Sequence, residues 1–182
     1  KDFEKYLETI NRQIKDIEKL VNEFSNFARM PRPVFKKKDV SEIIIRSIKF
    51  LEISTKCKIN NKVNSKNFFV NCDEEQINRV FINLIKNADE SISEITNKKP
   101  EYKGKIDIEI NRNNDYIVIF IIDNGEGISD KKKAMTPYFT TKKSGTGLGL
   151  PIVNKIINEH SGEIIINNKE GTTIEIWLPS VN

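Results

Sequence analysis

Two asparagines four residues apart on a predicted helix are the first residues here that could do chemistry. Asp73 with Gln76 is similar to a capping box and predicts a helix that continues to about Thr96. Asn83 and Asn87 then lie about 40° apart beside its apolar stripe. Asparagine is a poor helix former, and its amide oxygen is a ligand that Mg²⁺ accepts alongside phosphate oxygens and water. The pair suits a Mg²⁺–phosphate site, although solvated residues of an asparagine-rich chain would give the same pattern.

A glycine-containing turn follows an apolar run that we interpret as a strand. The segment DNGEG extends from Asp123 to Gly127. A carboxylate at a strand end can accept a hydrogen bond from the adenine amine, whereas guanine presents an acceptor there, and two buried acceptors facing each other are unfavourable. Gly125 and Gly127 allow positive φ and a close backbone approach. The segment fits an adenine-selective site, and taken alone it also fits an ordinary turn.

A second group of glycines leads into a predicted helix that starts near Leu148. The segment GTGLGL, from Gly145 to Leu150, can turn backbone N–H groups and the positive helix end toward phosphates. It matches neither the dinucleotide fingerprint G-x-G-x-x-G nor the P-loop pattern, so it excludes both of those folds. Just before it lies PYFTTKKS, in which either Lys142 or Lys143 can reach a phosphate with its ammonium group.

The start of the chain predicts a long amphipathic helix, because apolar residues recur at alternating steps of four and three. Its seam consists of Phe3, Leu7, Ile10, Ile14, Ile17, Val21, Phe24 and Ala28. Because the helix is already under way at Lys1 and no methionine precedes it, we expect the chain to be a fragment. Pro31 and Pro33 end the helix and mark a domain boundary. Asp39 or Ser41 can then cap a second helix that ends near residue 54.

The remaining elements are predicted from alternation and turn signals. Short strands are expected near 59–63 and 67–71, and two β-hairpins pair 105–112 with 116–123 and 163–167 with 172–178. A helix is expected over about 148–159. The polar stretch 124–145 has no period of either kind, and loops of this length in compact domains are usually functional or disordered. We expect the lysines at 131–133 to be solvated surface.

The composition describes one ordinary domain with a small appendage. The 182 residues are 37% hydrophobic, and 30 basic against 26 acidic residues give a net charge of +4. Lysines outnumber arginines by 24 to 6, whereas nucleic-acid binding favours clustered arginine, so we expect no nucleic-acid partner. No apolar run reaches the about 18 to 20 residues of a membrane span, so we expect no membrane contact by this fragment. Cys57 and Cys72 lack metal or disulfide spacing and are expected to be reduced structural thiols in a cytosolic setting.

In their order and spacing, the motifs resemble the histidine-kinase ATP-binding domain of the GHKL superfamily. The resemblance rests on Asn83 and Asn87, DNGEG, PYFTTK, GTGLGL and EGTTIEIWLP, and it covers about residue 36 to the end. The first stretch, LVNEFSNFARMPRPVF, is similar to the end of the dimerisation hairpin and linker of NtrY-type nitrogen-regulation kinases. The implied fold is α+β: a two-layer α/β sandwich with a mixed sheet, the Bergerat fold, after a long dimerisation-type helix. The implied domains are a truncated hairpin helix (1–30), a linker (31–38) and the ATP-binding catalytic domain (39–182).

The resemblance also implies a role for each motif residue and the cofactors ATP and Mg²⁺. By similarity, Asn87 and Asn83 hold Mg²⁺ and the phosphates, Asp123 reads adenine, and Gly125 and Gly127 shape the pocket. Further nucleotide-binding residues are implied on the other side of the phosphates (Gly145, Thr146, Gly147, Leu148 and Gly149), in the lid (Phe139 as an apolar latch and Lys142 as a cation) and on the pocket wall (the hydroxyl of Thr172 or Thr173).

Two departures from the wider superfamily bear on the reaction. Hydrolytic relatives carry a glutamate general base at the position of Asn83, and an amide cannot take a proton from water. Transfer of phosphate to another nucleophile is therefore favoured over hydrolysis. In the family that nucleophile is a histidine on the first hairpin helix, which is absent here. The single histidine, His160, lies at a predicted helix end, and we interpret it as a structural cap favoured by the helix dipole.

The resemblance therefore implies a part of a two-component sensor histidine kinase that does not phosphorylate itself. The intact kinase is expected to be a homodimer that passes phosphate to a response regulator receiver domain, with this portion on the cytoplasmic side of a membrane-bound sensor. The alternative is a degenerate nucleotide-sensing or dimerisation module without phosphotransfer. A hydrolytic ATPase or a serine kinase of the same superfamily is disfavoured by Asn83 and by the segment FARMPRP.

Overall fold

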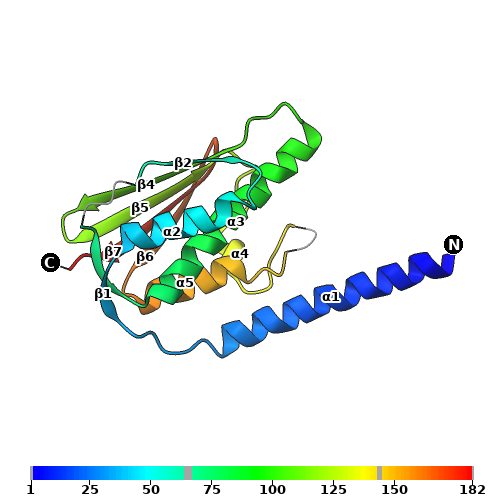
Figure 1. Ribbon diagram of the computed structural model, residues 1–182, viewed down its shortest axis with the longest axis horizontal. Helices are drawn as coiled ribbons and strands as arrows, with labels where there is room; N and C mark the ends of the chain where they lie inside the picture. The colour runs from blue at the N-terminus through cyan, green and yellow to red at the C-terminus, as the bar shows by residue number, and fades with distance from the viewer. Residues whose placement is uncertain (1, 64–66, 143–144, 182) are drawn as a thin grey trace.

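The computed structural model describes residues 2–63, 67–142 and 145–181 (Figure 1). The helices are α1 (Asp2–Ala28), α2 (Val40–Glu52), α3 (Glu74–Lys98), α4 (Lys131–Ala134) and α5 (Gly149–Glu159). The strands are β1 (Lys36–Asp39), β2 (Lys58–Asn61), β3 (Phe69–Cys72), β4 (Lys105–Asn113), β5 (Tyr116–Asp123), β6 (Glu163–Lys169) and β7 (Gly171–Pro179).

The body of the molecule has two layers, with α2, α3 and α5 on one face of a sheet (Figure 1). The sheet has the strand order β2-β4-β5-β7-β6. Strand β2 is parallel to β4 and the other neighbours are antiparallel, so the sheet is mixed. A second, two-stranded sheet pairs β1 with β3. This architecture confirms the α+β sandwich predicted from the sequence.

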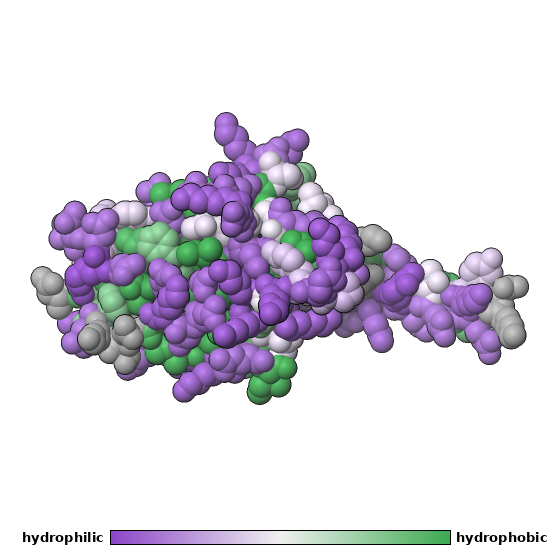
Figure 2. Space-filling view, turned by 90° about the horizontal axis from the view of Figure 1, so that it is seen from above, coloured by the Kyte–Doolittle hydropathy of each residue, from purple (hydrophilic) through white to green (hydrophobic). Residues whose placement is uncertain are grey.

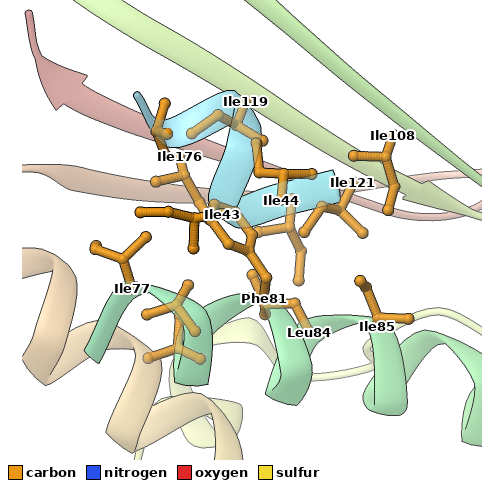
Figure 3. Packing of buried hydrophobic residues seen from close by; sticks show 14 of the residues in the cluster. Ile43, Ile44, Ile77, Phe81, Leu84, Ile85, Ile108, Ile119, Ile121 and Ile176 are labelled. Atoms are coloured by element: carbon orange, nitrogen blue, oxygen red, sulfur yellow. The ribbon is translucent and has the colours of Figure 1, made fainter. Parts of the chain in front are cut away.

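The core lies between the helices and the sheet and is built mostly of isoleucine. Figure 3 shows Ile43 and Ile44 of α2 and Phe81 of α3 pointing toward Ile119 and Ile121 of β5. All of these side chains are at most 1% exposed. Burying a side chain of this size contributes about 1.5–3 kcal/mol. The same packing fixes α3 against the sheet and thereby determines where its polar face lies.

Helix α1 projects away from the two-layer body (Figure 1), and its apolar seam is exposed. Ile10, Ile14 and Ile17 are 53%, 56% and 61% exposed. Near its end, the ring of Phe24 lies 6.3 Å from that of Tyr138, measured between centroids. The predicted long helix is therefore present, and it presents an uncovered seam.

Most predicted elements are present, with three differences. Strand β1 was missed because Lys36–Asp39 has no apolar alternation, and residues 36–38 had been assigned to the linker. The short helix α4 lies within the stretch predicted as a loop, and its lysines at 131–133 are exposed as expected. Of the two hydrogen bonds of a capping box, Asp73 makes one. Its side chain caps α3 at Glu75 N and Gln76 N, but its own N–H donates to His160 instead of to Gln76.

Figure 2 shows mostly hydrophilic residues on one face, with a group of hydrophobic residues on the body of the molecule. Among the described helices, none combines the length and hydropathy required to cross a membrane.

Candidate nucleotide-binding site

A cavity of about 540 Å³ lies between α3, the start of α5, the end of β5, the start of β7 and the segment that precedes α5. Its volume is within the range typical of small-molecule sites, about 300–1,000 Å³. Eleven of the fourteen predicted nucleotide-binding residues line it: Asn83, Asn87, Asp123, Gly127, Phe139, Lys142, Gly145, Thr146, Gly147, Gly149 and Thr172. Segments far apart in the sequence therefore meet around one space.

The asparagine pair faces the start of α5. Asn83 Nδ2 donates to Arg79 O at 2.9 Å, and Oδ1 is the acceptor atom that the amide can offer to a ligand. A Cβ placed on Gly149 would lie 3.7 Å from Asn83 Oδ1 and 3.6 Å from Asn87 Oδ1. The two amide oxygens and the first residue of α5 thus border the same part of the cavity.

The start of α5 offers free backbone donors to this part of the cavity. Leu148 occupies the N-cap position, and no side chain of the described residues caps the helix there. The N–H groups of Gly149 and Leu150 therefore have no helical partner, because the first N–H groups of a helix have no carbonyl to bond. Pro151 contributes no N–H. Such a helix start favours anions.

Asp123 is at the other end of the cavity and is 6% exposed. Its Oδ1 accepts hydrogen bonds from Gly125 N at 2.8 Å and Thr172 N at 3.4 Å. Thr172 is its direct partner across β5 and β7. Burial raises the pKa of this carboxyl, while the hydrogen bonds from Gly125 and Thr172 oppose the shift. The Thr172 hydroxyl also bonds this carboxylate. Oδ2 receives neither backbone N–H, so it keeps the capacity to accept a hydrogen bond from a ligand.

The apolar wall beside Asp123 was not predicted as part of the site. Ile121 lies two residues before Asp123 on β5, and Ile174 lies two residues after Thr172 on β7. Because side chains alternate along a strand, each isoleucine shares a face with its polar neighbour. Both line the cavity. The two-residue spacing was the signal that could have identified them.

The glycine-rich segment before α5 folds back on residues 138–142, called the lid below. Gly147 has φ +69°, and a Cβ there would lie 2.6 Å from the carbonyl carbon of Tyr138. Tyr138 N also donates to Gly147 O at 3.1 Å. A larger residue would be strained and would collide with backbone. Glycine at 147 therefore allows the lid to pass directly beside the start of α5.

The lid is tied to α3 through Lys142. Lys142 Nζ lies 2.7 Å from Glu90 Oε2 and 3.2 Å from Asn87 O. Its neighbour Lys143, the other predicted phosphate-binding cation, lies outside the described residues. Lys142 therefore reaches the edge of the asparagine pair, as the phosphate-binding hypothesis requires.

Three predicted residues do not line the cavity. Leu148 is fully buried, and its side chain belongs to the core cluster. Thr173 alternates with Thr172 and faces away from the helices. Gly125 packs against Ser91, whose Oγ would collide with a Cβ at this position. The role of Gly125 in shaping the pocket stays a prediction, through its packing against Ser91, which lines the cavity. The side chains of Leu148 and Thr173 do not line the cavity.

The loop after α2 forms a rim of the cavity that the sequence did not indicate. Ser54 and Thr55 line the cavity, and Asp89 Oδ1 holds the following residues by accepting from Lys56 N, Cys57 N and Cys57 Sγ at 3.0, 3.3 and 3.1 Å. Burial, with the nearby Asp89, raises the pKa of Cys57 to about 12. The thiol is therefore protonated and structural, as expected.

His160 is the C-cap of α5 and joins this helix to α3. Its Nδ1 lies 2.7 Å from Ile156 O, and its Nε2 accepts from Asp73 N at 3.0 Å. Both ring nitrogens are engaged, and the ring is 4% exposed. Burial lowers the pKa of His160 against the opposing effects of Ile156 O and Asp73. The structural role is as expected, but the reason differs: the ring acts as a neutral connector and not as a cation at the helix dipole.

Substituting His160 with alanine is expected to destabilise the chain by about 1–3 kcal/mol, because the partly buried Asp73 N–H loses its acceptor. Because the folded-state pKa is lowered, the wild-type ring contributes its full stability above the unfolded-state pKa, about 6.5, and loses it as the pH falls through the folded-state value. Urea unfolding at pH 7.5 and pH 5 measures this. A wild type that loses no more stability on acidification than His160→Ala would contradict the neutral-connector role.

Comparison with known proteins places these observations in a family. Residues 72–182 match the family model described as histidine kinase-, DNA gyrase B-, and HSP90-like ATPase. An NtrY-like sensor histidine kinase of Rickettsia felis is 38% identical over 96% of this chain and 29% of its own length. The nitrogen regulation protein NtrY of Azorhizobium caulinodans is 36% identical over 91% of the chain and 22% of its own length. The chain thus spans less than a third of these relatives.

Solved structures agree with the sequence match. The catalytic domain of the histidine kinase ThkA superposes with a TM-score of 0.67 and 29% identity, covering 81% of this chain and 96% of that one. The resemblance drawn from the motifs, including its NtrY-type character, is therefore confirmed. The chain belongs to the family of histidine kinase-, DNA gyrase B- and HSP90-like ATPases.

Proposed function

We propose that this chain is the ATP-binding part of a sensor histidine kinase, and that ATP binds with Mg²⁺ in the cavity between α3 and α5. One observation carries the proposal: the asparagine pair, Asp123, the start of α5 and Lys142 surround a single cavity. It has an acceptor at one end and several anion-binding groups at the other. An adenine nucleotide has the matching polarity, with an amine at one end and phosphates at the other.

The adenine end is supported by the surroundings of Asp123. Its Oδ2 can accept from the exocyclic amine, while Ile121 and Ile174 provide an apolar surface for the ring. Guanine would place a carbonyl oxygen against the buried carboxylate, which is unfavourable. The site should therefore select adenine over guanine.

The phosphate end is supported by the donors at the start of α5 and by Lys142. Asn83 Oδ1 and Asn87 Oδ1 are the protein atoms that would hold Mg²⁺. Among the described residues there is no group of three or more His, Cys, Asp or Glu side chains suited to a metal ion. Mg²⁺ commonly takes a few protein oxygens together with phosphates and water, so the two amides fit this ion. The bound ion would neutralise phosphate charge during transfer.

The arrangement favours transfer of the γ-phosphate to a nucleophile of another segment. Asn83 cannot act as a general base toward water, because a neutral amide does not take up a proton at neutral pH. We infer that the acceptor is a histidine elsewhere in the intact kinase and that a response regulator then receives the phosphate.

The exposed seam of α1 supports the proposal that residues 1–30 belong to a dimerisation hairpin. A helix with such a seam gains stability when a partner helix covers it. We propose a homodimeric intact kinase, bound to a membrane through other segments, with this portion in the cytoplasm. The division into a helix (1–30), a linker (31–38) and a catalytic domain (39–182) is part of the same proposal.

The chain is expected to bind ATP without labelling itself. Its single histidine has both ring nitrogens engaged and is buried, so no phosphoacceptor is accessible. Incubation with γ-labelled ATP and Mg²⁺ should therefore yield no acid-labile phosphoprotein, while a fluorescent ATP analogue binds the same preparation. Acid-labile label on this chain alone would contradict the proposal. Failure to bind the analogue would instead favour a degenerate module.

A further inference from the structure

Lys142, the proposed phosphate-binding cation of the lid, already has an anionic partner. Its ammonium group lies 2.7 Å from Glu90 Oε2 and 3.2 Å from Asn87 O. The Lys142 side chain is 26% exposed and that of Glu90 is 57% exposed, so this ion pair lies at the mouth of the cavity. Both residues line it.

Glu90 shares a helix face with the asparagine pair. It follows Asn83 by seven residues and Asn87 by three, and these spacings bring all three side chains to one side of α3. A carboxylate here faces the space proposed for phosphates. The charged residues lining the described cavity are four acids (Asp89, Glu90, Asp123 and Asp130) and two lysines (Lys86 and Lys142).

The backbone around Lys142 is held by hydrogen bonds within its own segment. The Lys142 side chain is the part that bonds to α3. Lys142 N donates to Thr140 Oγ1 at 3.1 Å, and Gly145 N donates to Lys142 O at 3.3 Å. Among the ion pairs described in the structure, the one between Lys142 and Glu90 joins the lid to α3. This pair therefore ties the lid to α3 at the mouth of the cavity.

We propose that Glu90 is a positioning residue that competes with the nucleotide phosphates for Lys142. Glu90 holds the ammonium and with it the lid, and a phosphate oxygen of a bound nucleotide replaces Glu90 as the main anionic partner of Lys142. If both anions stayed on one ammonium, their like charges would repel at a few ångströms. Glu90 thereby lowers ATP affinity and eases release of the nucleotide. This inference rests on the nucleotide site proposed above.

The test is a double-mutant cycle on the full 182-residue chain, with ATP affinity measured by competition against a fluorescent analogue in Mg²⁺. Glu90→Gln keeps the size of the side chain and removes its charge, so ATP should bind about fivefold more tightly, the effect expected of a partly exposed ion pair. In the Lys142→Met background, the same substitution should change affinity by less than about twofold. Adenosine, which has no phosphate, should bind both wild type and Glu90→Gln equally.

The exposed Glu101, which does not line the cavity, provides the matched control, because Glu101→Gln makes the same change in net charge. Weaker ATP binding by Glu90→Gln, or an equal gain in the Lys142→Met background or in Glu101→Gln, would overturn the proposal. Absence of ATP binding by the wild type, or ATP binding that Asn87→Ala leaves unchanged, would instead refute the nucleotide site itself. The two failures are therefore distinguishable.

Discussion

Asn87→Ala is expected to lose Mg²⁺-dependent ATP binding, with affinity reduced at least about tenfold, or about 1.4 kcal/mol. Asn87 Oδ1 is one of two neutral oxygens beside the start of α5, and Asn83 alone would leave the ion with one protein ligand. Alanine has a higher helix propensity than asparagine, so α3 should not be weakened. The loss would therefore report on the site and not on the fold.

A fluorescent ATP analogue titrated with and without Mg²⁺ measures this effect. Asn97→Ala is the matched control, because Asn97 is exposed near the end of the same helix and does not line the cavity. The control should bind as the wild type does. Metal-dependent binding that persists in Asn87→Ala would exclude this asparagine as a ligand of Mg²⁺ or phosphate.

Asp123→Asn is expected to weaken ATP binding by about 10- to 100-fold, equivalent to about 1–3 kcal/mol. Because Oδ1 receives both backbone N–H groups, an asparagine must keep its carbonyl oxygen there and place its NH₂ group at the Oδ2 position. The NH₂ group would then face the adenine amine, donor against donor. It would match the guanine carbonyl better. The ratio of ATP affinity to GTP affinity should therefore fall by a larger factor than the ATP affinity itself.

The same variant should fold at least as stably as the wild type near pH 7. Burial raises the pKa of Asp123, so its contribution to stability is present below the unfolded-state value, about 3.9, and is lost as the pH rises through the folded-state value. At neutral pH the buried charge opposes folding, and asparagine removes it. Thermal unfolding together with ATP and GTP titrations separates the two effects. A variant with a lower Tm at pH 7 and unchanged nucleotide preference would contradict both arguments.

The positions of the helices and hairpins could be predicted because their signals are local. The 3.6-residue period of α3 placed Asn83 and Asn87 on one face, and Asp73 marked the start of the helix. Glu90 was missed although the same period, extended by one turn, would have found it. Strand β1 was missed because Lys36–Asp39 forms a strand only through its pairing with β3.

The convergence of the site could not be derived from the spacing of residues alone. Asp123 meets Thr172 because β7 lies beside β5 in one particular register, and that register depends on tertiary packing. His160 shows the same limit. Its position at a helix end was evident, whereas its bond from Asp73 N depends on how α5 meets the start of α3. It was the family resemblance that predicted that these motifs meet at one nucleotide site.

A structure of this chain with a non-hydrolysable ATP analogue and Mg²⁺ tests the central claim most directly. The account predicts the adenine amine on Asp123, the phosphates at the start of α5, the ion on Asn83 and Asn87, and Lys142 moved from Glu90 to a phosphate oxygen. Nucleotide bound outside this cavity, or bound within it with its base away from Asp123, would contradict the account.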